Sequence, residues 1–152
     1  MITNYERYMG QKSLKMDPKY RVSIQSSWRP ETGTPLYLQH GENSGAGFIK
    51  VLSREAYLER VERVQLSNKT PAEKGHLLKM LASSCRDAQI NDQGKLLVPK
   101  EVSERAGITA DSDVVLLGCG IHFEIWSKEN YDKVHKLDAA KLAELDDLGI
   151  FN

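Results

Sequence analysis

The chain has 152 residues, 40% of them hydrophobic, and its 21 basic and 21 acidic side chains give a formal net charge of zero. This composition indicates a globular protein with one ordinary core or two small fused ones, and the balanced charge argues against coating nucleic acid through bulk charge. The sequence shows neither an apolar run near the roughly 20 residues that cross a bilayer nor the apolar centre of a signal peptide, so we expect a cytoplasmic protein without membrane association.

The first half of the chain alternates between short apolar stretches and polar turns. Residues 13–16 alternate and end at Asp17-Pro18, after which residues 21–24 alternate again, which predicts a strand, turn, strand hairpin. Residues 36–38 and 48–52 predict two more strands, separated by a glycine-rich loop. Ser53 is placed to cap the helix that follows, in which Tyr57, Val61 and Val64 share one face.

The second half follows the same plan after a break at residues 68–71, where Thr70 caps a helix and Pro71 takes its first position. A turn containing Gly94 leads into a strand at 95–98, and a short helix from Pro99 stops at Gly107. Strands are predicted at 114–117 and 122–126, and Ser127 caps a closing helix to about residue 137. Residues 138–145 are again helical and amphipathic, before an apolar tip at 148–151.

Two segments of the first half recur in the second half at one spacing of 74 residues. Residues 49–57 match 123–131 without a gap, and residues 17–24 match 91–98, in each case a polar turn with a cation that leads into an apolar strand. This spacing exceeds the roughly 20 to 50 residues of solenoid repeats. We therefore predict two equivalent modules that fold as one body around a pseudo-twofold axis, because chains this short bury too little apolar surface alone.

These residues resemble the MraZ family, the tandem form of the swapped-hairpin AbrB-like DNA-binding fold. The family signature, present once per half, is an Asp, three residues and an Arg, usually with Gly before the Arg and Pro closing the strand. The first half keeps Asp17, Lys19 and Arg21, and the second half keeps Gly94 and Pro99. Further matches lie at residues 106–108 and 123–128, and the likeness extends from about residue 8 to residue 134.

The resemblance implies an α+β fold, mainly β, in which two pseudo-twofold related swapped-hairpin AbrB-like modules form a small β-barrel-like core with flanking helices. We expect a first module at 1–67, a connecting helix at 68–84, a second module at 85–137 and a C-terminal tail at 138–152.

The chain departs from the family signature at both turns. Tyr20 stands where the family has Gly, and because a bulky residue resists a positive φ, we expect this turn to differ from the family's. Gln25 replaces the Pro that closes the strand. Asn91 and Lys95 replace the Asp and Arg of the second copy, so that copy lacks the charged pair and the bidentate fork of Arg.

Arg21 is the first candidate for contact with DNA, because a guanidinium can bind guanine through two parallel hydrogen bonds. Two interpretations of its neighbour Asp17 remain open, an ion pair that only fixes the turn and a carboxylate that orients Arg21. Other cations would bind phosphates, while three further residues shape the turns. The phosphate candidates are Lys12, Lys15, Lys19, Lys95 and Arg86, and the turn residues are Asp17, Asn91 and Gly94.

The resemblance also implies a ring-like homo-oligomer that binds direct repeats in promoter DNA. Such a protein would be associated with the nucleoid and would repress its own division and cell-wall gene cluster. The alternative is a protein-interaction or antitoxin-like module of the same fold that has no specific DNA site. The acidic stretch at 138–147 and the apolar tip would suit that role.

Enzymatic and metal-dependent functions have little support in the sequence. The four histidines are scattered, and HExxH, GxSxG and paired CxxC motifs are absent from the sequence, so we expect no enzyme, cofactor or small-molecule substrate. Cys119 and His122 supply only half of a zinc site, within a glycine-rich turn, and we expect no metal there. Both cysteines are expected to be free thiols, and Trp28 and Trp126 to be core or interface anchors.

Overall fold

The structure, a computed structural model, describes residues 4–151 and shows a mixed α+β fold, which confirms the predicted fold class. Residues 1–3 and 152, which the expected first module and tail include, lie outside the described residues. In chain order the elements are β1 (Gln11–Lys15), β2 (Arg21–Ser23), η1 (Ser26–Trp28), β3 (Leu36–Asn43), β4 (Ala46–Leu52), α1 (Arg54–Gln65), α2 (Pro71–Ser84), β5 (Cys85–Ala88), β6 (Lys95–Leu97), α3 (Lys100–Arg105), β7 (Asp113–Gly118), β8 (Phe123–Ser127), α4 (Lys128–Leu145) and η2 (Asp146–Leu148).

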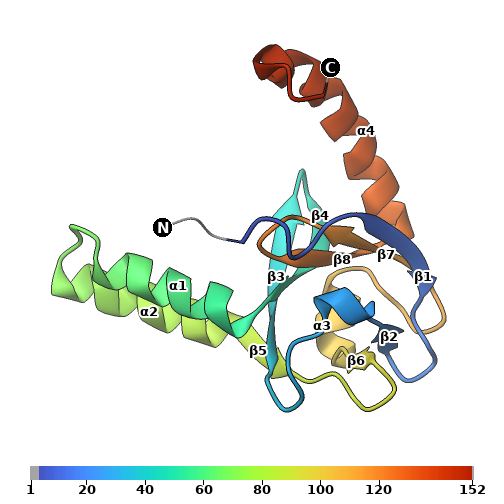
Figure 1. Cartoon of the computed structure of the whole chain (residues 1–152), viewed down its shortest axis with the longest axis horizontal. Helices are drawn as coiled ribbons and strands as arrows, with labels where there is room; N and C mark the ends of the chain where they lie inside the picture. Colours follow the sequence, from blue (N-terminus) through green and yellow to red (C-terminus); the bar gives the residue numbers. More distant parts are fainter. Residues whose placement is uncertain (1–3, 152) are drawn as a thin grey trace.

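The strands form a six-stranded antiparallel sheet in the order β1-β7-β8-β4-β3-β5 and a two-stranded ribbon of β2 and β6. The larger sheet curves around the ribbon and α3 (Figure 1). β1, from the first half of the chain, pairs with β7 of the second half, and β5 of the second half pairs with β3 of the first. Each half therefore gives its first strand to a partner in the other half.

The repeat in the sequence corresponds to a pseudo-twofold axis in the fold. Val22 and Leu96, which are 74 positions apart, face each other in the ribbon, and Lys50 faces Glu124 in the large sheet in the same way. The hydrogen bonds around the ribbon obey the same relation. Ile24 N–H donates to Gly94 O at 3.0 Å, and Val98 N–H donates to Tyr20 O at 2.9 Å. Equivalent residues of the two halves thus occupy equivalent positions.

The predicted hairpin of residues 13–16 and 21–24 is wrong, because β1 and β2 belong to different sheets. The turn between them does close, since Asp17 N–H donates to Arg21 O at 2.9 Å. Beyond the turn the two strands separate, and β1 pairs with β7 while β2 pairs with β6. The predicted polar turn is confirmed, but the strands on either side of it take partners distant in sequence.

The main core lies between the concave face of the large sheet and the ribbon. Val22 and Leu96 of the ribbon are buried there, together with an aromatic group of Tyr8, Trp28 and Phe123, whose ring centroids are 5.0 to 5.9 Å apart. On the other face of the sheet, α4 covers a smaller cluster in which Phe48 and Trp126 stack at 4.5 Å. Both tryptophans are therefore core anchors, as predicted.

The helices begin where the capping residues predict. Ser53 Oγ accepts from Ala56 N–H and Ser127 Oγ from Asn130 N–H, each at 3.1 Å, while Thr70 and Glu73 form a capping box at the start of α2. α4 is one continuous helix over the two helical segments expected at residues 128–145. Among the described residues, no helix is long and apolar enough to span a membrane.

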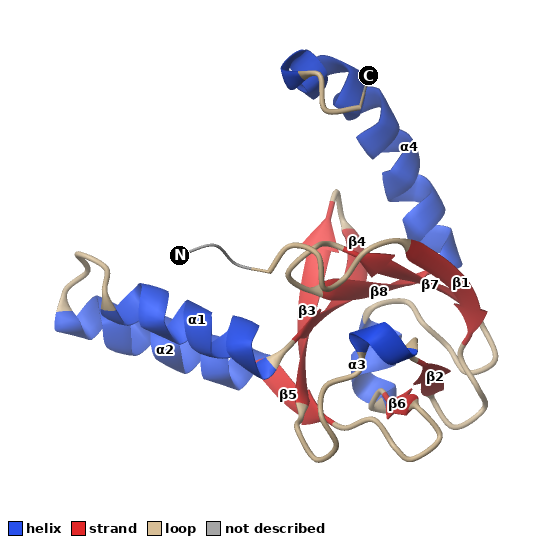
Figure 2. Ribbon diagram, in the orientation of Figure 1, coloured by secondary structure: helices blue, strands red, loops and turns tan. Residues whose placement is uncertain are grey.

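Two helical parts extend away from the body of the protein (Figure 2). α1 and α2 lie side by side and project from the edge of the sheet, and none of the residues of α2 is buried. α4 projects in a different direction, and residues 147–151 that follow it are exposed. Large apolar side chains are exposed on both parts, namely Leu58, Leu66, Leu77, Met80, Leu137, Leu142, Leu145, Leu148, Ile150 and Phe151.

Candidate nucleic-acid interface

The outward face of the β2–β6 ribbon carries a cation from each half of the chain. Val22 and Leu96 point inward and are buried, so by the alternation of strands their neighbours point outward. Arg21 lies opposite Leu97, and Lys95 lies opposite Ser23. Arg21 and Lys95 are thus diagonal neighbours, whose Cα atoms are about 7–8 Å apart in such an arrangement. We call this outward face, which carries Arg21, Ser23, Lys95 and Leu97, the ribbon face.

The turn before β2 is built around the carboxylate of Asp17. Its Oδ1 accepts the backbone N–H groups of Lys19 and Arg21, each at 2.8 Å, and its Oδ2 accepts the Nε–H of Arg21 at 2.8 Å. Partial burial acts to raise the pKa of Asp17. The hydrogen bonds from the backbone and guanidinium of Arg21 and from the Lys19 amide outweigh that effect and hold the pKa below its ordinary value of 3.8.

The guanidinium of Arg21 is held by one nitrogen and stays accessible through the others. The side chain of Arg21 is 32% exposed and that of Asp17 is 19% exposed. Among residues 4–151, Arg21 Nη1 and Nη2 have no hydrogen-bond acceptor. The pair therefore fixes the direction of the side chain, while the two terminal nitrogens can still bind a planar acceptor edge or a phosphate. Both sequence interpretations of Asp17 are compatible with this geometry.

The turn before β6 repeats the backbone arrangement without the ion pair. Asn91 Oδ1 accepts the N–H groups of Gln93 at 2.9 Å and Lys95 at 3.0 Å, as Asp17 Oδ1 does in the first turn. Gly94 has φ +76°, and a Cβ atom at this position would collide with the guanidinium of Arg29. Arg29 is itself fixed, because its Nε–H donates to Ile24 O at 2.8 Å. Glycine at position 94 thus avoids both the strain of a left-handed backbone and a collision with Arg29.

Tyr20 adopts the conformation that its equivalent Gly94 adopts, with φ +59°. The first turn keeps the same hydrogen bonds as the second, since Tyr20 N–H donates to Asp17 O at 3.1 Å and Gly94 N–H donates to Asn91 O at 2.9 Å. Within this chain the two turns therefore share one backbone conformation, and the expected difference from the family's turn stays a prediction. Tyr20 packs against the main core, and that packing offsets the strain of a left-handed backbone at a bulky residue.

The other candidate cations are spread over the two sheets. Lys12 and Lys15 are exposed on β1, but their odd spacing places them on opposite faces of that strand, and Lys19 is exposed in the first turn. Arg86 lies on β5, at the far edge of the large sheet, and its Nη1–H donates to Glu101 at 2.8 Å. The structure thus brings Lys19 and Arg21 together at the first turn. Lys15 lies on β1, which does not form the expected hairpin with β2. Arg86 is paired with the carboxylate of Glu101.

Sequence reasoning missed two residues that the structure makes important. One is Arg29, whose guanidinium occupies the space beside Gly94, and no local sequence motif predicts this contact. The other is Glu124, whose carboxylate lies beside His122 and Cys119. The sequence could have indicated the position of Glu124, because His122 and Glu124 are two apart in the strand predicted at 122–126 and such residues share a face. Burial raises the pKa of the Cys119 thiol to about 12, and the nearby Glu124 charge adds to that rise, so Cys119 is not an activated nucleophile.

Comparison with known proteins identifies one group of similar sequences, although no family model matches the chain. The chain is 26% identical over 138 residues to a protein of Heliobacterium modesticaldum named Transcriptional regulator MraZ. The match covers 91% of this chain and 93% of that protein. The identity is 27% over 124 residues with the Bifidobacterium longum protein of the same name, covering 82% and 79%. The Acidovorax sp. protein of the same name is 29% identical over 148 residues, and the match covers 93% of this chain and 95% of that protein.

Proposed function

The chain is a divergent member of the MraZ family, and we propose that it is a DNA-binding transcriptional regulator that contacts duplex DNA with its ribbon face. Relatives that cover most of the chain are named transcriptional regulators and not enzymes. Their identities of 25% and 29% leave room for a changed operator. The proposal therefore rests on this chain's own geometry as well as on the family.

The observation that carries the proposal is the Asp17–Arg21 pair on the ribbon face. Asp17 binds Nε of Arg21 at 2.8 Å, and the side chain of Arg21 remains 32% exposed. An arginine that only stabilised a turn would gain little from this pairing, since exposed ion pairs contribute about 0–1 kcal/mol. An arginine held in this direction can place its terminal nitrogens on O6 and N7 of guanine, which discriminates against other bases by about 1–3 kcal/mol.

The remaining candidate cations supply contacts to phosphates in this proposal. Lys19, in the same turn, and Lys95, diagonal to Arg21 on the ribbon, would bind phosphates near the base contact. Lys12 and Lys15 point to opposite faces of β1, so only one of them can extend this positive surface. Arg86 would contribute only after release from Glu101. The number of contacts per chain is small, so a single chain is expected to bind weakly and to lose affinity with salt.

We further propose that the protein acts as a homo-oligomer, ring-like as the resemblance implies. The exposed apolar residues of α1, α2 and α4 support association, because such patches favour contact with other protein surfaces. An oligomer holds several ribbon faces together, and binding to one repeat then raises the effective concentration for the next. On the nucleoid, such an oligomer would occupy direct repeats at its own promoter and repress its division and cell-wall gene cluster.

Fluorescence anisotropy with DNA from upstream of the protein's own gene tests this proposal. The wild-type chain should bind a fragment with several repeats more tightly than one with a single repeat, and Arg21→Ala should weaken binding to both. Lack of binding at low salt, or wild-type affinity in Arg21→Ala, would contradict the proposal.

A truncation after Leu137 separates DNA binding from a protein-interaction role. The removed residues include much of α4 and the exposed tip of Leu148, Ile150 and Phe151. A truncated protein that binds DNA but has a lower mass by light scattering would assign this part to assembly. Loss of a captured protein partner, in a chain that never bound DNA, would instead favour the antitoxin-like alternative.

A further inference from the structure

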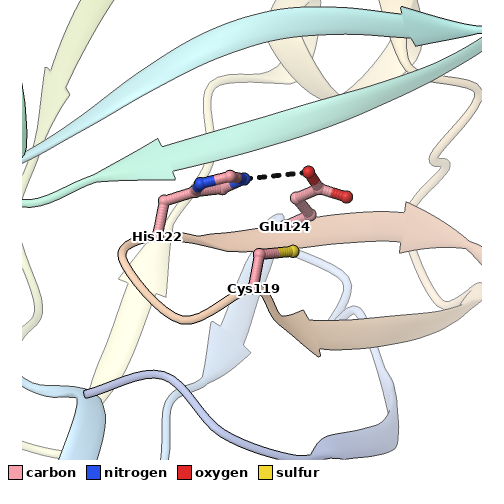
Figure 3. Close-up of side chains that lie close together, drawn as sticks. All are labelled: Cys119, His122 and Glu124. Atoms are coloured by element: carbon pink, nitrogen blue, oxygen red, sulfur yellow. Dashed lines mark hydrogen bonds and ion pairs between the residues drawn. The ribbon is translucent and has the colours of Figure 1, made fainter. Parts of the chain in front are cut away.

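The turn between β7 and β8 brings three side chains of different metal-binding chemistry together (Figure 3). Cys119 lies in the turn, His122 immediately precedes β8, and Glu124 lies on β8. One ligand atom from each, a sulfur, an imidazole nitrogen and a carboxylate oxygen, lies within 4.8 Å of the other two. Figure 3 shows the imidazole directed at the carboxylate, with the sulfur close to both.

We propose that Cys119 Sγ, His122 Nε2 and a carboxylate oxygen of Glu124 bind one zinc-like divalent transition-metal ion, with a fourth position open to solvent. Thiolate, imidazole and carboxylate are the three ligand types that zinc takes in proteins. Soft sulfur in the set disfavours Mg²⁺ and Ca²⁺, which prefer oxygen ligands. This site is separate from the ribbon face and goes beyond the proposed DNA binding.

The distances suit a tetrahedral ion after a small adjustment. His122 Nε2 and Glu124 Oε2 are 2.9 Å apart as a hydrogen-bonded pair. With bonds of about 2.0–2.2 Å to each atom, a tetrahedral zinc ion would hold them about 3.3–3.4 Å apart. The pair therefore needs to open by only about half an ångström, and the Cys119 sulfur, within 4.8 Å of both atoms, would have to move closer by rotation of its side chain.

The surroundings hold the three ligands in place. Trp126 Nε1–H donates to Glu124 Oε1 at 2.9 Å, which orients the carboxylate so that Oε2 faces His122. The side chains of His122 and Glu124 are only 15% and 13% exposed, so water competes weakly for them. Nδ1 of His122 is buried without a hydrogen-bond partner among residues 4–151. Within the described residues, the hydrogen bond of the His122 ring is therefore the one from Nε2 to Glu124.

The backbone of the turn is also fixed. Cys119 N–H donates to His122 O at 2.9 Å, and Gly120 exchanges hydrogen bonds with Tyr8 at 2.9 and 3.1 Å. A Cβ atom on Gly118 would lie 2.6 Å from the carbonyl oxygen of Tyr8, so the segment before β1 approaches the turn closely. A bound ion would therefore stiffen the turn against which the chain leading into β1 is packed.

The charge balance of the occupied site is favourable. The ion's two positive charges are matched by the thiolate and the carboxylate, with neutral imidazole, and the thiol proton leaves to the buffer. The competing interpretation is a network of hydrogen bonds that only stabilises the hairpin, with Lys50 opposite Glu124 supplying positive charge. Cys119→Ser distinguishes the two, because a serine hydroxyl can replace the thiol's hydrogen bond to Leu117 O, at 3.6 Å, but supplies no thiolate to a metal ion.

Cobalt titration of the purified full-length chain, without DNA, tests the proposal. Co²⁺ replaces Zn²⁺ in such sites, and its absorption reports both thiolate ligation, through a charge-transfer band, and tetrahedral geometry. One equivalent should produce both signals, and added Zn²⁺ should displace them. Cys119→Ser should abolish the charge-transfer band, and His122→Ala and Glu124→Gln should each weaken binding at least about tenfold, the lower end of the effect of losing an outer partner.

The chain supplies matched controls for each ligand. Cys85→Ser removes the other thiol, and His40→Ala breaks a second His–Glu pair, His40 and Glu42 at 3.3 Å on β3, which has the same spacing. Both variants should bind cobalt as the wild-type chain does, and circular dichroism of the aromatic side chains should show each variant folded. Absence of a charge-transfer band in the wild-type chain, or its persistence in Cys119→Ser, would overturn the proposal, whatever the outcome for DNA.

Discussion

The two turns that lead into the ribbon have the same backbone and different side-chain chemistry. In both, an oxygen of the first residue, Asp17 Oδ1 or Asn91 Oδ1, accepts two backbone N–H groups at 2.8–3.0 Å. Only the first turn adds an ion pair, from Arg21 to Asp17 Oδ2. Because Asn91 closes its turn without a charge, the fold does not require the carboxylate of Asp17. The additional charge orients Arg21 without being needed to close the turn, which is what the proposed base contact requires.

The first half also carries more positive charge around its turn than the second half does. Lys12, Lys15, Lys19 and Arg21 of the first half correspond, 74 positions on, to Arg86, Gln89, Gln93 and Lys95. Two of the four positive charges are thus missing from the second half, and Arg86 is paired with Glu101. The first half thus carries the denser positive surface, while the second half shares mainly the geometry of the turn.

Replacing Arg21 is expected to have the largest effect on DNA binding. Arg21→Ala should cost about 1–3 kcal/mol and relax the preference for the contacted base, because it removes a bidentate contact. Lys95→Ala should weaken binding to all sequences similarly and reduce the slope against log salt by about 1, as expected for a phosphate contact. Anisotropy at several salt concentrations measures both. Equal losses of specificity in the two variants would refute the asymmetry of the turns.

Replacing Gly94 should test the geometry of the second turn. Gly94→Ala should lower the free energy of unfolding by about 1–2 kcal/mol through the left-handed backbone alone, and by more because Arg29 must move. Urea denaturation measures this loss. In an Arg29→Ala background the same substitution should cost less, since the collision is relieved. Equal costs in both backgrounds would show that Arg29 is not the obstacle.

Converting the second turn into a copy of the first should show whether both turns contact DNA. The double variant Asn91→Asp with Lys95→Arg restores the carboxylate and the guanidinium at the ends of the same backbone turn. If the second turn lies against DNA, affinity for the operator should rise by about 1 kcal/mol, the lower end of one base contact. Unchanged affinity, measured with the same DNA at the same salt, would assign recognition to the first turn alone.

The smallest expected effect is a pH dependence that belongs to the first turn only. The pKa of Asp17 is lower in the folded chain than its ordinary value of 3.8. The stability from this group is therefore fully present above that value and is lost as pH falls through the folded pKa. Because the pair is partly exposed, the loss should be at most about 1 kcal/mol. Asp17→Asn should remove this component from urea denaturation curves at low pH, and an unchanged pH profile would refute it.

Local patterns in the sequence predicted local structure well. Ser53, Thr70 and Ser127 start helices because each side chain caps the backbone directly after it, an interaction that needs no distant partner. The repeat spacing located Val22 and Leu96 as equivalents, and they face each other in the ribbon. These features depend on residues close in sequence or on direct comparison of the halves.

Features that depend on distant contacts could not be predicted in the same way. Strand pattern alone does not reveal that β1 pairs with β7 and not with β2, because both arrangements bury the same alternate residues. Tyr20 takes a positive φ because packing against the core outweighs the local preference. Arg29 lies beside Gly94 through a contact that the sequence does not display. The pairing of Glu124 with His122 follows from their spacing, but the approach of Cys119 depends on how the turn folds.

The exchange of first strands between the halves makes the two modules inseparable. Cutting the chain in the loop between α1 and α2, at residues 66–70, would leave β1 bound to β7 and β5 bound to β3, so the two fragments would hold each other without a covalent link. A protein made of one half alone could satisfy the same pairings only by interlocking with a second copy of itself. Tandem fusion thus turns what would be a dimer contact into the interior of a single molecule.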